Sequence, residues 1–271
     1  MNITNILLIV FAFVFSSCEH ETKIVQGHAH NDYENPNPLV DALENGFVSV
    51  EADVYLIDDN LYVSHDLPVK LDSSLTLESL YLNPIENHIE NNNGLVYKNY
   101  SGSFYLMIDF KTSAKPTYSM LKSILSNYSS IISIVTNGVE QKRVIKVFIS
   151  GQEGCRPISE VLNDEPKLAG LDGRPEDLQK NIPSSIMPVI SDNYANLLSW
   201  NGYEEINKEE WENLRLLVQE THAQNKLLRL WAAPDNSIVW KFLLDNGVDL
   251  INTDQLNEFR KFIMTYSSSR K

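Results

Sequence analysis

Three short apolar runs between Lys23 and Pro68 each end in a pair of chemically reactive side chains. These pairs are His28 and His30, then Glu51 and Asp53, then His65 and Asp66. Between the first two runs, residues 38–46 begin with a proline, carry leucine and alanine on one face and end in glycine, which predicts a short helix. Strand, helix and strand with polar groups at the strand ends form a βαβ unit, whose site lies at the carboxyl ends of the strands.

The rest of the chain repeats this alternation. Apolar segments typical of strands begin near residues 24, 47, 104, 145, 168, 187, 227 and 248. Segments with helical spacing separate most of them, at residues 38–46, 76–94, 118–132, 209–225, 238–246 and 256–266. Such alternation implies a parallel sheet. The length of 271 residues suits one large domain or two small ones, and without residues 1–17 the remaining 271 − 17 = 254 residues are close to the roughly 250 typical of a (β/α)₈ barrel. We therefore predict an α/β fold, a single (β/α)₈ TIM barrel over residues 24–266, followed by a tail over residues 267–271.

The N-terminal residues resemble an export signal. Residues 6–15 are unbroken apolar sequence, too short to span a bilayer, which takes about 20 residues, and Ser16-Ser17-Cys18 follows them. Small residues before a lone cysteine resemble a bacterial lipoprotein processing site, at which Cys18 would carry lipid. We expect a signal peptide over residues 1–17, a tether over 18–23, and an exported protein anchored by lipid to the bacterial membrane, periplasmic or on the cell surface. An ordinary cleaved signal or an uncleaved anchor is the alternative.

The charge balance limits the possible partners. The chain carries 22 basic and 36 acidic residues, a formal charge of −14, which argues against a nucleic-acid partner. Any phosphate site must therefore gain its positive charge locally, from a metal, a lysine or histidines. If Cys18 is lipidated, Cys155 has no disulfide partner, and we expect a buried or incidental thiol there. We expect a monomer.

Three acids form a candidate metal site. Glu51 and Asp53 are separated by one residue on a predicted strand, so their side chains point the same way. Carboxylates facing a barrel interior need a cation to remain charged, and Asp109, at the end of the next strand, would complete a set of three oxygen ligands. A hard, oxygen-only set suits one divalent cation, Mg²⁺ or Ca²⁺. Two acids at a solvated strand end is the simpler alternative.

His28 and His65 flank these acids and could act as general base and general acid. Taken singly, each histidine could equally be a structural hydrogen-bonding residue. His30 could be a third site residue or could bind loop backbone. Lys111, two residues after Asp109, could offer a fixed positive charge to an anionic substrate, or could simply be an exposed lysine.

The order of these motifs resembles the glycerophosphodiester phosphodiesterase and phospholipase-C-like superfamily of metal-dependent TIM barrels. Within it, the chain most resembles the branch of altered inheritance of mitochondria protein 6, through the runs Gly27-His28-Ala29-His30-Asn31-Asp32-Tyr33 and Ser49-Val50-Glu51-Ala52-Asp53-Val54. It is also similar to spider-venom sphingomyelinase D, in these runs, in Asp109-Phe110-Lys111 and in the late tryptophan Trp231. The resemblance spans about residues 23 to 259.

The resemblance implies a role for each matching residue. His28 and His65 correspond to the catalytic pair, and Lys111 to a lysine that contacts phosphate. The divalent metal ligands correspond to Glu51, Asp53 and Asp109, and the aromatic wall of the pocket to Trp231. One position differs, because classical glycerophosphodiesterases have an arginine where this chain has Ala29, with Asn31 as the nearby polar residue.

The implied activity is that of a metal-dependent phosphodiesterase acting on a glycerophosphodiester or a phospholipid-derived small molecule. Substrate specificity could come from polar side chains at later strand ends, which are Asp172, Arg174, Asp192 and Asn193. His28-x-His30 also resembles an amidohydrolase metal motif, but the only histidines after His65 are His88 and His222, outside the predicted strand ends. A non-catalytic lipoprotein that binds a phosphorylated ligand is the other alternative.

Overall fold

The computed structural model describes residues 24–268. Eight parallel strands form a closed barrel, because β1 pairs with both β2 and β11. In chain order these strands are β1 (Val25–Ala29), β2 (Phe47–Ile57), β4 (Phe104–Phe110), β7 (Ile145–Gly151), β8 (Gly170–Gly173), β9 (Val189–Asn193), β10 (Leu227–Trp231) and β11 (Leu250–Thr253). All eight predicted strands are present, and the predicted TIM barrel is confirmed.

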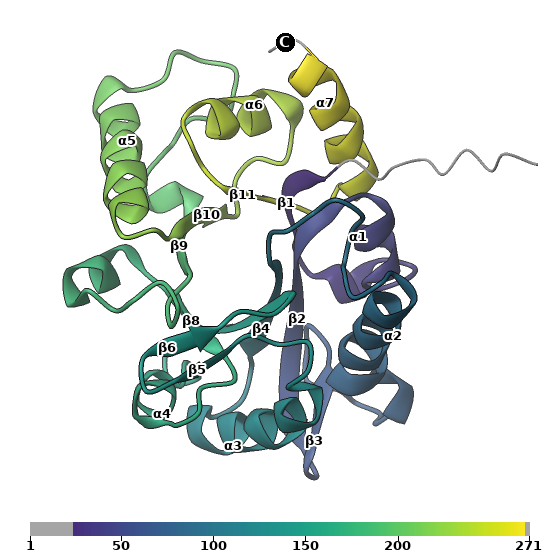
Figure 1. Cartoon of the computed structure of the whole chain (residues 1–271). Helices are drawn as coiled ribbons and strands as arrows, with labels where there is room; N and C mark the ends of the chain where they lie inside the picture. The colour runs from purple at the N-terminus through teal and green to yellow at the C-terminus, as the bar shows by residue number, and fades with distance from the viewer. Residues whose placement is uncertain (1–23, 269–271) are drawn as a thin grey trace, which may run out of the picture.

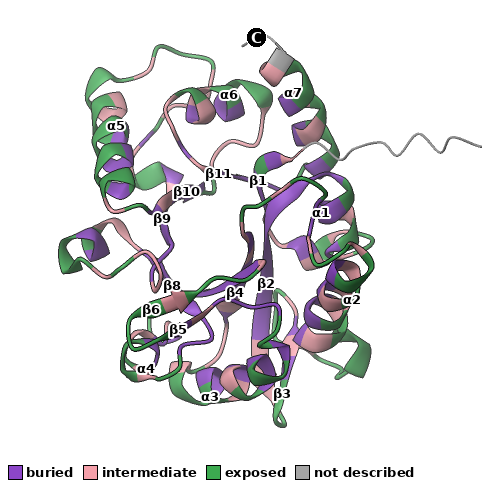
Figure 2. Cartoon of the chain, viewed as in Figure 1, coloured by how far each residue is buried: buried purple, intermediate pink, exposed green. Residues whose placement is uncertain are grey.

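The α-helices surround this barrel (Figure 1). They are α1 (Val40–Glu44), α2 (Asn83–Asn91), α3 (Ala114–Leu125), α4 (Ile158–Asn163), α5 (Lys208–Ala223), α6 (Ser237–Asp245) and α7 (Leu256–Ser268). Their inner faces and the strands are buried, and their outer faces are exposed (Figure 2). No helix in the described part of the chain is both long and apolar enough to cross a membrane.

Short elements decorate the barrel. A π-helical turn over Glu78–Leu82 leads directly into α2, so the predicted helix at 76–94 is present with an irregular start. The strand β3 (Asn60–Val63) pairs antiparallel with β2, so His65 follows a hairpin rather than a barrel strand. A second hairpin, β5 (Ile134–Thr136) and β6 (Val139–Gln141), escaped the sequence analysis. Its signal is Asn137-Gly138, whose positive φ angles of 50° and 77° suit a tight hairpin turn.

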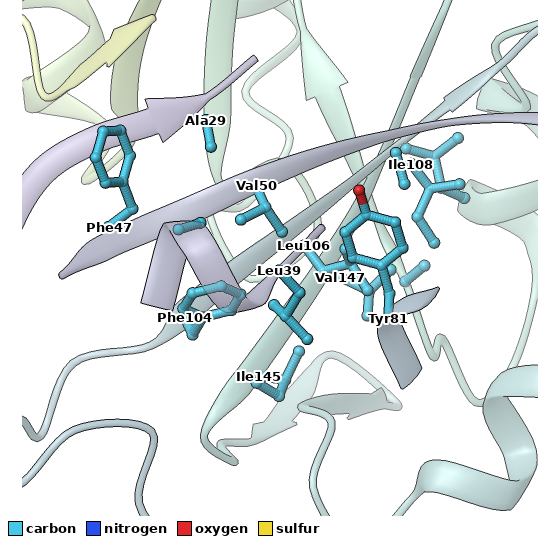
Figure 3. Close-up of a cluster of buried hydrophobic side chains, with 14 of the residues drawn as sticks. Ala29, Leu39, Phe47, Val50, Tyr81, Phe104, Leu106, Ile108, Ile145 and Val147 are labelled. Carbon is cyan, nitrogen blue, oxygen red and sulfur yellow. The ribbon is translucent and has the colours of Figure 1, made fainter. Parts of the chain in front are cut away.

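The barrel wall is buried on both sides. Outward-facing side chains of the strands pack under α1, α2 and the turn before α2 (Figure 3). The cluster drawn includes the strand residues Phe47, Val50, Phe104, Leu106 and Ile145, together with Leu39 at the start of α1 and Tyr81 in the turn before α2. Gly27 permits this packing, because a Cβ atom there would lie 2.5 Å from the ring of Phe47. The free Cys155 is buried, as predicted.

The inside of the barrel has an apolar layer and a polar layer. The apolar layer is a separate cluster of Val48, Met107, Phe148, Val189 and Leu250. Side chains two positions further along a strand lie on the same face, one layer closer to the carboxyl end. After Met107, Phe148, Val189 and Leu250, those residues are Asp109, Ser150, Ser191 and Asn252. The apolar layer therefore closes the barrel beneath a polar floor.

Candidate active site

A cavity of about 770 Å³ lies above this polar floor. Its lining comes from the ends of several barrel strands and includes His30, Glu51, Asp109, Lys111, Ser150, Arg174, Asp192, Arg229 and Trp231. These side chains come together because parallel strands end at the same edge of the barrel. The cavity thus occupies the edge at which the sequence predicts the functional site.

Two of the predicted acids, Glu51 and Asp109, line this cavity together with Lys111, and Asp53 lies beside Lys111 just outside the lining. Asp53 on β2 is the register neighbour of Asp109 on β4. The ammonium nitrogen of Lys111 lies 2.8 Å from Asp53 Oδ2 and 2.7 Å from Asp109 Oδ2. Glu51 precedes Asp53 by two residues and therefore projects from the same face of β2.

Positive charge does not fully compensate this acid cluster. Burial, together with the nearby charges of Glu51 and Asp109, raises the pKa of Asp53 to about 6. Burial also raises the pKa of Asp109, although Lys111 opposes the shift. The Oδ1 atom of Asp53 is buried and has no hydrogen-bond partner among residues 24–268. Lys111 remains protonated, since the charges of Asp109 and Asp53 outweigh burial and raise its pKa.

The chemistry of these donors fits a divalent cation. Carboxylate oxygens are the ligands that Mg²⁺ and Ca²⁺ prefer, and the unpartnered Oδ1 of Asp53 is an available ligand atom. In the described residues, however, no three His, Cys, Asp or Glu side chains are arranged as a ready-made metal site. Lys111 instead bridges two of the acids. The residues that could hold a cation are Glu51, Asp53 and Asp109, with Lys111 displaced from between them.

His28 lies in the barrel wall behind Glu51 and is fully buried. Its Nε2 is 3.0 Å from Glu51 Oε2, and its Nδ1 is 2.7 Å from Ser49 Oγ. A carboxylate only accepts hydrogen bonds, so Nε2 carries the hydrogen, and in the neutral ring Nδ1 accepts from the serine hydroxyl. Burial and the charge of Arg229 lower the pKa of His28 to about 4.

Arg229 is the main counter-charge of Glu51. Its Nη2 donates to Glu51 Oε2 at 3.0 Å, and its Nε donates to Asn252 Oδ1 at 2.9 Å. Burial would raise the pKa of Glu51, but Arg229 and His28 lower it to about 2. Arg229 was not predicted as a site residue. The signal was its position two residues before Trp231 on a strand, which puts both side chains on one face.

His65 reaches the acid cluster from outside the barrel. Its side chain is 58% exposed, and its Nδ1 lies 3.4 Å from Asp53 Oδ2. The hydroxyl of Tyr33, a second residue to which the sequence analysis gave no role, lies 2.8 Å from the same oxygen and 3.3 Å from His65 Nδ1. His28 therefore contacts Glu51, and His65 contacts Asp53.

The predicted substrate-binding residues are divided between the cavity and its surroundings. His30 and Trp231 line the cavity, as does Arg174, which is paired with Asp172 at 2.7 Å. Asn31 is outside the lining, and its Oδ1 lies 3.0 Å from the hydroxyl of Tyr33.

The remaining predicted positions have local partners. Asp192 lines the cavity and accepts a hydrogen bond from Asn196, whereas Asn193 caps the turn that follows β9. Asp172 is fully buried and outside the cavity lining. Of the later histidines, His88 bonds the backbone of Val96, and His222 pairs with Asp249.

Comparison with known proteins identifies the family. Residues 17–161 match the AIM6-like phosphodiesterase domain, which is more than half of the chain. The chain belongs to this family. It is 27% identical over 261 residues to the altered inheritance of mitochondria protein 6 homolog of Arthroderma benhamiae, covering 85% of this chain and 81% of that protein. It is 28% identical to altered inheritance of mitochondria protein 6 of Eremothecium gossypii, covering 87% and 68%.

A solved structure supports the fold of this family member. A glycerophosphodiester phosphodiesterase from Parabacteroides distasonis aligns with a TM-score of 0.51, covering 91% of this chain and 98% of that chain. Sequence identity is 15%, so this likeness bears on the fold alone. The predicted membership of the glycerophosphodiesterase-like superfamily, in the branch of altered inheritance of mitochondria protein 6, is confirmed.

The relatives overturn the predicted location. The curated relatives are fungal proteins named for the inheritance of mitochondria, which contradicts an exported protein anchored by lipid to a bacterial membrane. The predicted signal peptide over 1–17, the lipidated Cys18 and the tether over 18–23 lie outside the described residues.

Proposed function

We propose that this chain hydrolyses a phosphodiester, of the glycerophosphodiester or phospholipid-derived class, with the help of one Mg²⁺ or Ca²⁺ ion. The observation that carries the proposal is the group of acids beside Lys111: Glu51 and Asp109 line the cavity, and Asp53 has an Oδ1 atom without a partner among residues 24–268. A family whose domain is described as a phosphodiesterase supports the reaction class.

The fixed charges of the site suit a phosphodiester monoanion. Lys111 remains protonated and lies on the cavity wall, so its ammonium group can bind a non-bridging phosphate oxygen. A bound divalent cation would stabilise the negative charge that builds up on the phosphoryl oxygens during displacement. Trp231, which is 36% exposed, offers a flat apolar surface to the organic part of the substrate.

The reaction requires two proton transfers. A base must take the proton of the attacking oxygen, and an acid must protonate the leaving oxygen, for which histidines are the usual groups. The assignment of both roles to His28 and His65 stays a prediction, supported by their contacts with Glu51 and Asp53. Attack by water would give a phosphomonoester, whereas attack by a neighbouring substrate hydroxyl would give a cyclic phosphate.

Phosphorus NMR of the purified chain tests this proposal. The substrates are glycerophosphocholine, glycerophosphoinositol and lysophosphatidylcholine, each with Mg²⁺, with Ca²⁺ and with chelator. A new resonance that depends on the cation is expected, and its chemical shift separates a cyclic phosphate from a monoester. Asp53→Asn is the matched control, since it removes one carboxylate charge without changing the shape of the side chain. Absence of product from the whole panel, with substrate binding measured, would favour a non-catalytic protein that binds phosphorylated ligands.

A further inference from the structure

The first three histidines of the described residues, His28, His30 and His65, have different access to the cavity. His28 is fully buried, with both ring nitrogens bonded inside the protein. His65 is mostly exposed and does not contribute to the cavity lining. His30 is the one of the three that lines the cavity, together with Glu51 and Lys111. An imidazole that is to exchange a proton with a bound substrate must face it.

An aspartate on the neighbouring strand holds the ring of His30. Because Ala29 on β1 pairs with Thr253 on β11, His30 and Asp254 follow at equivalent positions. His30 Nδ1 lies 2.7 Å from Asp254 Oδ1, and the backbone N–H of His30 donates to Thr253 O at 3.2 Å. The backbone of Asp254 is held in turn, since its N–H donates to Asp235 Oδ2 at 3.0 Å.

This contact determines which nitrogen of His30 is available. The carboxylate of Asp254 only accepts hydrogen bonds, so Nδ1 carries a hydrogen in either protonation state. His30 Nε2 has no hydrogen-bond partner within residues 24–268 and is the nitrogen left for a ligand of the cavity. A histidine oriented by a carboxylate through one nitrogen, with the other facing the reacting groups, has the arrangement of a proton carrier.

The charges around His30 favour its protonated form. Burial lowers the pKa of His30, but the hydrogen bond to Asp254 and the charges of Glu51 and Asp254 outweigh burial and the opposing charge of Arg229, so the pKa is raised. The adjacent His28 has its pKa lowered instead, to about 4, and is neutral over the physiological range. Of the two, His30 is the one that faces the cavity and holds a proton to donate.

We propose that His30, oriented by Asp254, takes the acid role in place of His28 or His65 and protonates the leaving oxygen of the phosphodiester. The attacking oxygen forms a bond to phosphorus and gives its proton to a separate base. The bond from phosphorus to the leaving oxygen breaks, and that oxygen keeps the electron pair and takes the proton from His30 Nε2. His30 then regains a proton from water. Asp254 is a positioning residue, which acts through His30.

This inference rests on the proposed phosphodiesterase activity, and two substrates separate it from that activity. The first is the alkyl diester that is cleaved fastest among glycerophosphocholine, glycerophosphoinositol and lysophosphatidylcholine, whose alkoxide needs a proton to leave. The second is the p-nitrophenyl ester of glycerol phosphate, whose phenolate leaves without one. His30→Gln should lower kcat for the alkyl diester by about 100-fold or more, while kcat for the nitrophenyl ester changes only a few-fold.

Variants at Asp254 test the positioning role. In the wild type, cleavage of the alkyl diester should fall as pH rises through the pKa of His30, because the acid loses its proton. Asp254→Asn removes the charge that raises this pKa, so the fall should begin at a lower pH, and Asp254→Glu should restore part of the shift. Nitrogen-15 NMR of the histidine rings measures the pKa of His30 directly in each variant.

His222 provides a matched control. Its Nε2 lies 2.8 Å from Asp249 Oδ2, a histidine–aspartate pair of similar length outside the cavity lining. His222→Gln should leave both activities unchanged.

Each outcome of these measurements bears on the inference. Equal losses on both substrates in His30→Gln, or no loss on the alkyl diester, would overturn it while leaving the phosphodiesterase proposal intact. A wild type that cleaves only the nitrophenyl ester would overturn it as well. A wild type that cleaves neither substrate would overturn both proposals. If His30→Gln does not fold, the pH profile and the His30 pKa of Asp254→Asn decide, and unchanged values in that variant refute the role of Asp254.

Discussion

Asp172, on the β8 side of the barrel interior, has a complete set of partners inside the protein. Its side chain is fully buried. Its Oδ2 accepts from Arg174 Nη1 at 2.7 Å and from Ser150 Oγ at 3.0 Å, and its Oδ1 accepts from Ser191 Oγ at 2.6 Å. The carboxylate is both neutralised and hydrogen-bonded through both oxygens.

Asp53, on the β2 side, is almost equally buried but is only partly satisfied. Lys111 serves Asp53 and Asp109 at once, and Glu51 adds a third nearby negative charge. Asp53 Oδ1 lacks a partner among the described residues, and the pKa of the carboxyl is raised to about 6. Asp53 on the β2 side therefore has a carboxylate oxygen free to bind a cation or substrate, whereas both oxygens of Asp172 on the β8 side are already hydrogen-bonded.

The difference separates a structural acid from a functional one. A buried charge with all of its bonds made inside the protein contributes to holding two strands together. A buried acid whose surroundings are incomplete costs stability and persists at sites where a substrate or cation completes it. Substitution of Asp53 should accordingly affect mainly activity, and substitution of Asp172 mainly stability.

Asp53→Ala should have the largest effect, and the effect should be on activity. Loss of a charge that organises the cation and the substrate should lower turnover by about 1,000-fold. Stability should change little, because removing a destabilised carboxylate offsets the small cavity left behind. Phosphorus NMR measures the turnover and urea unfolding measures the stability. Near-normal turnover would contradict the role of Asp53 in the reaction.

Asp172→Ala should show the opposite pattern. It leaves the guanidinium of Arg174, which is 21% exposed, without its carboxylate partner. Removing one member of a buried pair leaves an uncompensated charge, so the free energy of unfolding should fall by about 3 kcal/mol. Urea unfolding of this variant beside Asp53→Ala makes the comparison direct. Equal losses of stability in the two variants would remove the distinction between the two sides.

The sequence was sufficient for the fold and for most of the acid cluster. Strand and helix periods gave the eight barrel strands, and their order fixed where Asp53, Asp109 and Lys111 would meet, because parallel strands end together. The hairpin that carries His65 was less evident, since the short run at Asn60–Val63 does not reveal its antiparallel partner.

Partners contributed from distant strands could not be predicted. Arg229 meets Glu51 across 178 positions of sequence, and Asp254 meets His30 across 224. Such contacts depend on the closure of the barrel between β1 and β11, which no local pattern encodes. For the same reason the different exposure of His28 and His30, two residues apart, became apparent only from the folded chain.

Addition of Mg²⁺ or Ca²⁺ sharpens the comparison further. A cation that binds the native β2 side should raise the free energy of unfolding by about 2.7 kcal/mol when its concentration is 100 times its Kd. Asp53→Asn should abolish this gain, whereas Ser191→Ala, on the β9 strand, should retain it. Thermal unfolding over a series of cation concentrations measures the effect without any substrate. If neither cation stabilises the wild type, Lys111 and Arg229 would be the positive charges that act on the phosphate.

Asp32 tests whether a buried carboxylate with an unpartnered oxygen is by itself a sign of function. Like Asp53 it is buried, its Oδ1 has no partner in the described chain, and burial raises its pKa to about 6. Asp53 is joined through Lys111 to Asp109 on the cavity wall, whereas Asp32 lies outside the lining and its Oδ2 accepts from the backbone N–H of Leu39 at 2.6 Å. The unpartnered oxygen and raised pKa of Asp32 should therefore affect the stability of the protein and not its activity.

The pH dependence of Asp32→Asn follows from that raised pKa. The folded protein holds the carboxyl proton up to about pH 6, whereas the unfolded chain releases it near the ordinary value of 3.8. The folded state thus binds more protons in this interval, and wild-type stability falls as pH rises through it. Asparagine removes the effect, so the stability of Asp32→Asn relative to wild type should be about 2 kcal/mol more favourable at pH 8 than at pH 4. Urea unfolding at the two pH values measures this difference, and turnover per folded molecule should stay near that of the wild type.

A pH-independent difference would mean that Asp32 is not a buried, titrating carboxyl. A large loss of turnover would mean that the Asp32 carboxylate takes part in the activity, as Asp53 does.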